Sequence, residues 1–242
     1  MRATSKLAQS ALASVGALPD TPPGHRSRGA PGTSHTRGAM APDRCFPMTS
    51  SNALRGRLFP RAQSADARAA IDAVLDRFPF HLVARLVDAG TAIVPLVAGE
   101  RYSDASGALR RLGVDVDAWP LAPAGLFVVE ERTLYLRSTS GMTVAHELGH
   151  ALDCALGAGV YRSGFDPAIR RAFSQARDFV TPYAACGLDE YFAEGVRAYC
   201  GVNDAVSPWP RATRARLESI DRSLHAILGE IFDEAQSEAV SC

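Results

Sequence analysis

The sequence lacks several features that would assign it to a class at once. No apolar run reaches 18 residues, which excludes a membrane-spanning helix and stable insertion into a bilayer. CxxC spacing is also absent, so the few cysteines form neither a disulfide framework nor a cysteine-rich zinc module. We expect Cys154 and Cys200, which fall at helical positions, to be small core residues. The five cysteines are Cys45, Cys154, Cys186, Cys200 and Cys242.

Acidic residues are scarce in the N-terminal quarter of the chain. Residues 1–60 contain eight Lys or Arg and two Asp, so in a chain of net charge zero the remainder is net acidic. A domain without a basic face argues against nucleic acid as a partner. Because residues 1–60 are rich in Pro, Gly, Ser and Thr and lack apolar periodicity, we expect a disordered basic arm. Residues 1–18, with a basic start and a short Ala/Leu stretch, resemble a weak export signal.

Apolar periodicity begins near Ser64 and predicts one folded domain over residues 64–240. Ser64 and Ser103 are expected helix caps, and Asp166 before Pro167 is a third. The domain is expected to be α+β, with a small sheet followed by a mostly helical C-terminal half. We expect strands at 91–98 and in a hairpin over 125–138 that turns at Glu131-Arg132, and helices at 64–78, 81–90, 103–113, 142–156, 166–180, 189–200 and 210–235.

The stretch "TVAHELGHALD" at residues 143–153 carries the first chemical signal. Positions four apart lie on one face of a helix, so His146 and His150 can direct two imidazoles at one metal ion. Glu147 beside the first histidine is placed to take a proton from a metal-bound water and deliver it to a leaving amine. The apolar neighbours of these residues indicate a buried helix, which needs partners for three polar groups.

A third protein ligand must come from elsewhere in the chain. No histidine occurs between His150 and His225, which excludes the metzincin pattern and leaves a carboxylate. Asp166 is one candidate, but its place before Pro167 already explains it as a helix cap. The better candidate is "DEYFAEGVRAYC", in which Glu190 and Glu194 share one helical face. Two buried acids on one face repel each other unless a cation or a histidine N–H lies between them.

The pair "HELGHALD" and, about 40 residues later, "EYFAE" resembles the catalytic domain of anthrax lethal factor and its relatives, including the secreted clostridial Pro-Pro endopeptidases. The resemblance is specific over residues 120–200 and loose over 64–240. It implies a zincin-like metallopeptidase domain with Zn²⁺ held by His146, His150 and Glu190. It further implies that Glu194 supports a ligand histidine from behind and that Tyr183, seven residues before Glu190, stabilises the oxyanion.

The resemblance has limits that bear on substrate. The long domains with which the anthrax toxin binds its carrier and its kinase substrates have no counterpart here, and a clean signal peptide is lacking. Asp153 also matches the family pattern, and its role stays open: it either supports a metal ligand or is structural. The strand within residues 132–138 is read either as the sheet edge that binds a peptide substrate or as plain hairpin structure. Tyr183 can likewise be an ordinary loop tyrosine.

We therefore expect a monomeric zinc metalloendopeptidase with Glu147 and Tyr183 as catalytic residues and a peptide or protein substrate. The basic arm suits a secreted bacterial toxin or an effector delivered into a host cell, with a host protein as substrate. One alternative is a more distant clostridial-neurotoxin-like protease. Another is a non-catalytic binding protein that keeps zinc for stability, although a structural site needs no base such as Glu147.

Overall fold

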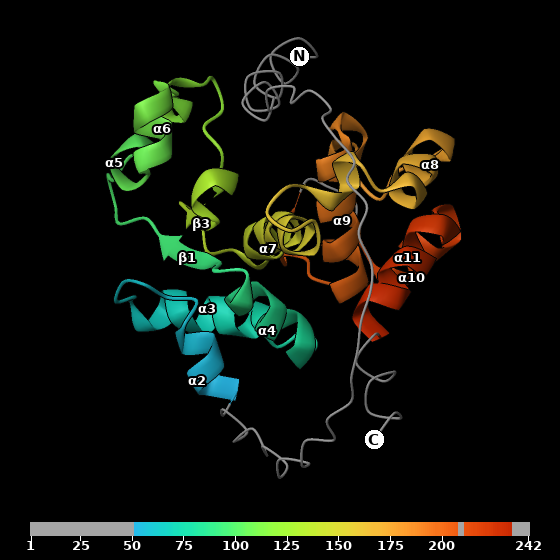
Figure 1. Ribbon diagram of the computed structural model, residues 1–242, viewed down its shortest axis with the longest axis horizontal. Coiled ribbons are helices and arrows are strands. Elements are labelled where there is room, and N and C mark those ends of the chain that lie inside the picture. Colours follow the sequence, from blue (N-terminus) through green and yellow to red (C-terminus); the bar gives the residue numbers. More distant parts are fainter. Residues whose placement is uncertain (1–50, 208–210, 234–242) are drawn as a thin grey trace, which may run out of the picture. The chain divides into compact units, whose positions relative to one another are not determined.

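The computed structural model describes residues 51–207 and 211–233, and Figure 1 shows the arrangement of their elements. The chain divides into two compact units, 1–48 and 49–242, and the described residues all belong to the second. The predicted basic arm up to residue 50 therefore lies outside the described residues. None of the described helices is both long enough and apolar enough to cross a membrane.

Three helices precede the sheet: α2 (Ser51–Gly56), α3 (Ala65–Leu75) and α4 (Phe80–Asp88). As predicted, Ser64 caps α3, its side chain accepting a hydrogen bond from the Ala67 amide. The expected disorder is wrong for residues 51–60, because this stretch forms α2 and buries Leu54 and Leu58. Two leucines four apart are too short a pattern to reveal a helix whose stability comes from packing on other segments.

The sheet consists of the strands β1 (Ala92–Pro95), β2 (Gly125–Val128) and β3 (Thr133–Leu136), in the order β1-β3-β2. β1 runs parallel to β3, and β2 runs antiparallel to it. The hairpin turns at Arg132, which has a positive φ of 50°, as predicted for this position. The reading of residues 132–138 as the sheet edge is wrong. β1 pairs with β3, so β3 is central and β2 is the free edge of the hairpin.

Alternate residues along the strands face two separate cores, as the two-residue period of a strand requires. Ile93 and Leu134 belong to the main core with the long helices, whereas Val94 and Tyr135 belong to a smaller core. The smaller core is closed by α5 (Tyr102–Ala105), α6 (Gly107–Leu112) and the 3-10 turn η2 (Val116–Ala118). The expected single helix capped by Ser103 is thus divided, and Ser106 caps its second part.

The central element is α7 (Gly141–Leu156), which lies between the sheet with α3 and α4 on one side and α9 (Leu188–Cys200) on the other (Figure 1). Ser140 caps α7 by accepting from the Thr143 amide. Gly149 permits the close approach of α7 and α9, because a Cβ at this position would lie 2.7 Å from the Cα of Ala193. This contact brings the two sequence motifs together.

The C-terminal half is helical, as predicted, and continues with the 3-10 turns η4 (Arg162–Gly164) and η5 (Tyr183–Cys186) and the helices α8 (Pro167–Gln175), α10 (Arg214–Ile220) and α11 (Arg222–Asp233). The single final helix expected over 210–235 is wrong. The chain breaks at Asp221, whose carboxylate accepts from the Leu224 amide and from the Tyr191 hydroxyl. The apolar period continues through this break, so periodicity alone does not reveal it.

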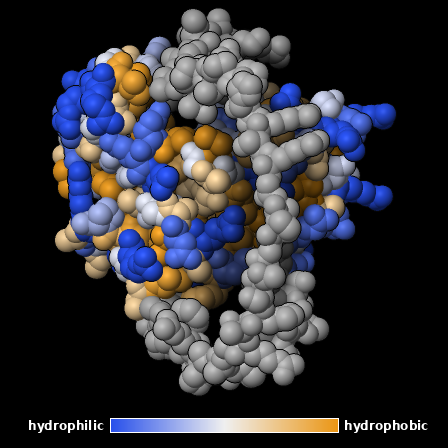
Figure 2. Space-filling model, viewed as in Figure 1, coloured by the Kyte–Doolittle hydropathy of each residue, from blue (hydrophilic) through white to orange (hydrophobic). Residues whose placement is uncertain are grey.

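Hydrophilic side chains cover the outer helices on both sides of the view in Figure 2. Arg110 and Arg111 are exposed on α6, and Arg170 and Arg171 are exposed on α8. The described residues thus form a mixed α/β fold with a small sheet and mostly helical content, in which the buried helix pair α7 and α9 carries the chemically reactive side chains.

Candidate metal centre

Helix α7 presents His146 and His150 toward α9, and Glu147, next to His146, lies against β2. Their side chains are largely removed from solvent, with Glu147 and His150 each only 6% exposed. The ring planes of the two histidines are nearly perpendicular, at 87°, with centroids 4.7 Å apart. The four-residue spacing therefore places both imidazoles at one point beside the helix, as predicted.

Helix α9 supplies two carboxylates to the same point. Glu190 and Glu194 are buried and lie one turn apart on the face that packs against α7. The Oε2 atom of Glu190 lies 3.2 Å from Nε2 of His146 and 3.5 Å from Nε2 of His150. The two Nε2 atoms are themselves 3.1 Å apart. One oxygen and two nitrogens therefore converge on a single small space.

These three atoms fit a zinc ion. Ligand atoms about 2.0–2.1 Å from a tetrahedral Zn²⁺ lie roughly 3.3 Å from one another, which is the spacing found here. In addition, Glu190 Oε2 is buried and has no hydrogen-bond partner among the described residues, which would be costly in a metal-free protein. His146, His150 and Glu190 form the candidate metal-binding group of the described part of the chain.

Glu194 holds His146 from behind. Its Oε1 atom lies 2.9 Å from Nδ1 of His146, which directs Nε2 of that ring toward Glu190. Thr181 donates its hydroxyl to Oε2 at 2.6 Å. Arg197 donates to both oxygens, from Nε at 3.0 Å and from Nη2 at 2.7 Å, and its side chain is only 1% exposed. Every lone-pair direction of this buried carboxylate therefore has a partner.

The charges of this cluster shift its pKa values in opposite directions. Burial by itself would lower the pKa of His146, but contact with Glu190 and Glu194 raises it to about 10. Burial by itself would raise the pKa of Glu194, but His146 and Arg197 lower it to about 2. The pKa of Glu190 is also lowered, against its burial, by the two histidines. Without metal, a proton on the histidines therefore compensates the carboxylates.

Glu147 faces the free edge of the sheet. A Cβ at Gly125, the first residue of β2, would lie 2.6 Å from Cγ of Glu147, so only glycine leaves room for this side chain. Burial raises the pKa of Glu147, although the nearby histidines oppose the rise. A carboxylate with a raised pKa beside a metal site is suited to accept and return a proton.

Tyr183 lies on the His146 side of the cluster. Its ring centroid is 5.4 Å from that of His146, and its hydroxyl donates to Oε1 of Glu190 at 3.0 Å. The residue as a whole is 42% exposed, whereas its hydroxyl lies within hydrogen-bond distance of the buried Glu190. Burial of the hydroxyl, with Glu190 beside it, raises its pKa and keeps it a proton donor. The predicted seven-residue spacing thus brings Tyr183 to Glu190.

Asp153 and Asp166 both have structural partners. The buried Asp153 accepts from the backbone N–H of Ser163 at 2.8 Å and from its hydroxyl at 2.5 Å, and burial raises the pKa of Asp153 to about 6. Asp166 caps α8 by accepting from the amides of Ala168 and Ile169, and it also pairs with Arg162. Asp166 is therefore a helix cap, and the alternative third ligand is ruled out.

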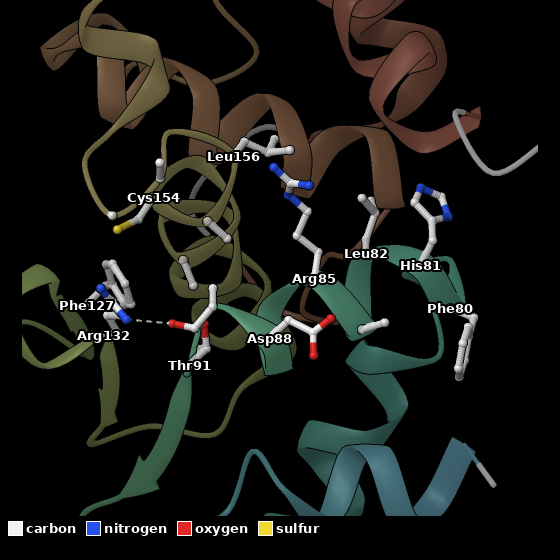
Figure 3. Close-up of a pocket in the computed structure, with 16 residues that line it drawn as sticks. Phe80, His81, Leu82, Arg85, Asp88, Thr91, Phe127, Arg132, Cys154 and Leu156 are labelled. Atoms are coloured by element: carbon white, nitrogen blue, oxygen red, sulfur yellow. Dashed lines mark hydrogen bonds between the residues drawn. The ribbon is translucent and has the colours of Figure 1, made fainter. Parts of the chain in front are cut away.

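A cavity of about 780 Å³ lies away from the metal cluster, between α4 and the C-terminal half of α7 (Figure 3). Apolar side chains including Leu82, Phe127 and Leu156 form much of its wall, and Arg85 and Asp88 lie at its α4 side. Cys154 also lines it, but burial raises the pKa of this thiol to about 11. The thiol is therefore protonated at neutral pH, which agrees with its prediction as a core residue.

The fold defined by these elements matches that of a known peptidase. No protein-family model matches the sequence, and no curated protein matches it. Among solved structures, the Pro-Pro endopeptidase PPEP-2 from Paenibacillus alvei superposes with a TM-score of 0.54 at 19% sequence identity, over 74% of this chain and 100% of that chain. The chain therefore has a Pro-Pro endopeptidase-like fold. The comparison does not bear on the resemblance to lethal factor.

Sequence reasoning missed several residues around the cluster: Gly125, Tyr161, Ser163, Thr181 and Arg197. The glycine that starts a β-rich run and the arginine three residues after Glu194 are visible in the sequence, but neither spacing indicates contact with a metal site. The other three lie in loops, where no periodicity reports direction. Their positions follow only from the packing of α7 against α9 and β2.

Proposed function

We propose that this protein is a zinc-dependent endopeptidase. The observation that carries the proposal is the convergence of His146 Nε2, His150 Nε2 and Glu190 Oε2 at 3.1–3.5 Å, beside the buried carboxylate of Glu147. Three protein ligands with a free base next to them are typical of catalytic rather than structural zinc sites. The Pro-Pro endopeptidase-like fold supports the same reaction class.

His146, His150 and Glu190 would hold the zinc ion. When bound there, zinc would make a water molecule acidic enough to attack at neutral pH and would polarise the scissile carbonyl. Glu147 accepts the proton of the attacking water on its carboxylate and then donates it to the leaving amine nitrogen. The absence of a side chain at Gly125 leaves room for the Glu147 side chain beside the free edge of β2.

Tyr183 would stabilise the negative charge that develops on the carbonyl oxygen. Its hydroxyl donates to Glu190 Oε1 here, and we expect it to exchange this acceptor for the substrate oxygen. The raised pKa of the phenol keeps the proton in place for this hydrogen bond. Glu194 would keep His146 oriented throughout the cycle by accepting from its Nδ1–H.

The substrate would be a peptide in extended conformation, added as a strand to the free edge of β2. This edge starts at Gly125, directly beside Glu147, so a strand bound there passes the base. Peptides containing a Pro-Pro bond are the first candidates because of the named specificity of the structural neighbour. Secretion, delivery into a host cell, a host-protein substrate and a monomeric state remain predictions from the sequence.

The test is the variant Glu147→Gln, which keeps shape and removes the base. We expect it to bind one zinc ion per chain and to lose peptide cleavage by roughly 10²–10⁴-fold. The matched control is Glu218→Gln, on the exposed face of α10, which should cleave at the wild-type rate. A peptide library that includes Pro-Pro members serves as substrate. Wild-type protein that binds zinc but cleaves no peptide would favour the non-catalytic binding protein instead.

A further inference from the structure

The two histidines of the metal cluster are supported in different ways. His146 has its Nδ1 atom bonded to Glu194, the usual arrangement for a zinc-ligating imidazole. His150 has no such bond: its Nδ1 atom is buried and has no hydrogen-bond partner among the described residues. Something other than a hydrogen bond must therefore keep the ring of His150 turned toward the metal position.

The ring of His150 contacts two other rings. His146 meets it edge-on, and Tyr161 packs against it with centroids 5.6 Å apart and planes inclined by 45°. Tyr161 is in turn backed by Phe127 of β2, at a centroid distance of 6.4 Å. No hydrogen bond of the Tyr161 hydroxyl occurs within the described part of the chain, so the ring makes the contact.

The loop that carries Tyr161 is attached to the same helix as His150. Asp153, three residues after His150, accepts from both the N–H and the hydroxyl of Ser163, and both residues are fully buried. Tyr161 lies two residues before Ser163. The chain turns sharply at the end of α7, and only glycine fits at Gly157, because a Cβ there would lie 2.0 Å from the Val160 carbonyl oxygen. The Asp153–Ser163 contact thus determines where the Tyr161 ring lies.

We infer that Tyr161 is a positioning residue for the metal ligand His150, and that Asp153 and Ser163 act by holding Tyr161 in place. Packing replaces the hydrogen bond that His150 lacks. This inference rests on the proposed function, because it requires His150 to bind zinc. It also assigns the role of Asp153, which acts on the metal site through the loop and not as a ligand. The ring of Tyr161, rather than its hydroxyl, is the part that matters.

The test compares Tyr161→Phe with Tyr161→Leu in the full chain. Zinc affinity is measured by competition with a chromogenic chelator, and ligand geometry by the visible absorption spectrum of the cobalt(II)-substituted protein. Tyr161→Phe keeps the ring and should match the wild type in both. Tyr161→Leu should weaken zinc binding by about tenfold, the lower end of the range for losing a residue that supports a metal ligand. It should also alter the cobalt spectrum. Equal affinity and spectra for Leu and wild type, or equal losses for Phe and Leu, would overturn the inference.

The matched control is Tyr199→Leu. Tyr199 is a buried tyrosine at the far end of α9 that packs on Phe232 and away from the metal cluster. Its loss should lower stability but leave zinc affinity and the cobalt spectrum unchanged. If Tyr199→Leu weakens zinc binding as much as Tyr161→Leu does, the effect is general destabilisation and the inference is wrong.

The path through the loop is tested with Ser163→Ala, which removes one of the two hydrogen bonds to Asp153. Alone, it should weaken zinc binding about two- to threefold, less than Tyr161→Leu. Combined with Tyr161→Leu, it should add nothing, because Ser163 acts through the ring that is already absent. Full additivity in the double variant would refute this path.

Failure of the inference differs from failure of the proposed function. A wild-type protein that binds no zinc contradicts the proposed function itself, and the inference with it. A wild-type protein that binds zinc and cleaves peptides, with a Tyr161→Leu variant of unchanged affinity and spectrum, contradicts only the inference.

Discussion

The surroundings of His146 and of His150 differ although the two residues lie one turn apart on α7. Behind His146 there is a charged network of Glu194, Arg197 and Thr181, in which each contact is a directed hydrogen bond. Beside His150 there are aromatic rings and a loop held by Asp153. A buried ionic network tolerates no missing partner, whereas packing of rings tolerates a change of shape at modest cost. Variants of the charged network should therefore have larger effects than variants of the aromatic contact, and a change beside Glu147 should affect neither histidine.

The largest effect is expected from Arg197→Met. This change removes one of the two positive partners of the buried Glu194 carboxylate together with two of its hydrogen bonds. Removing one partner of a buried ion pair typically costs about 3–5 kcal/mol in the free energy of unfolding. Urea unfolding of the metal-free protein measures it. The double variant Glu194→Gln with Arg197→Met removes both charges and should regain most of the loss. If the free energy of unfolding of Arg197→Met lies within about 1 kcal/mol of that of the wild type, the network is not as tightly coupled as its geometry implies.

The charged network around His146 should also make the free energy of unfolding of the metal-free protein depend on pH. Glu194 has a pKa of about 2 in the folded protein and 4.5 as its ordinary value, so its contribution is present above pH 4.5 and is lost as pH falls through 2. His146 has a pKa of about 10 against 6.5, so its contribution is complete below pH 6.5 and is lost as pH rises through 10. Metal-free protein should therefore be most stable between pH 4.5 and 6.5.

Unfolding in urea from pH 2 to pH 10 measures both limbs, on the order of 3 kcal/mol for Glu194 and 5 kcal/mol for His146 if the shifts act in full. Glu194→Gln should remove the part of the acid limb that belongs to Glu194 and leave the part that belongs to Glu190. Added zinc should remove the alkaline limb, because the metal takes the place of the proton on the histidines. A metal-free protein whose stability does not change between pH 6.5 and 10 would contradict the assignment of the charged cluster.

A smaller effect, on zinc affinity, is expected from Glu194→Gln. The amide oxygen can still accept from Nδ1 of His146, but the charge that strengthens this bond is gone, so zinc affinity should fall by about 10–100-fold. This loss should equal or exceed that of Tyr161→Leu, because a directed ionic contact is replaced rather than a packing contact. Chelator competition on the two variants side by side gives the ranking. The reverse order would mean that the His150 side is the stronger support.

The smallest effect is expected from Gly125→Ala, which touches neither histidine. The new Cβ would meet Cγ of Glu147 at 2.6 Å and force the base to move. We expect kcat to fall by about tenfold, with zinc affinity unchanged, because misplacement of a catalytic group affects the reaction and not the metal. Steady-state kinetics with zinc titration checks this. A loss of zinc affinity would show that β2 also supports the ligands.

Much of the candidate site could be predicted from helical spacing. His146, His150, Glu190 and Glu194 are pairs four apart on buried helices, and this spacing alone places each pair on one face. Tyr183 could be named only through a family resemblance, since a loop residue has no period to indicate its direction. Arg197 and Tyr161 could not be named at all. Their roles depend on which segments pack behind the ligands, and that depends on the fit of α7 against its neighbours.

Parts of the fold escaped prediction for related reasons. The break at Asp221 interrupts a continuous apolar period, and its cause is a partner on another helix, the Tyr191 hydroxyl. The hairpin over 125–138 was evident, but nothing local tells which of its strands receives β1. That choice is made by the parallel pairing of Ile93 with Leu134 and leaves β2, not β3, as the free edge. Both errors concern partners that are distant along the chain.

By itself, the sequence determined the ligand types, the base and the helices that carry them, because side-chain chemistry and the 3.6-residue period are local properties. Only the tertiary structure decided that Gly149 lets α9 approach α7, that β2 borders Glu147, and that the two histidines have unlike support. These depend on contacts between segments far apart in the chain. Their free energies arise from packing and burial, which no local pattern encodes.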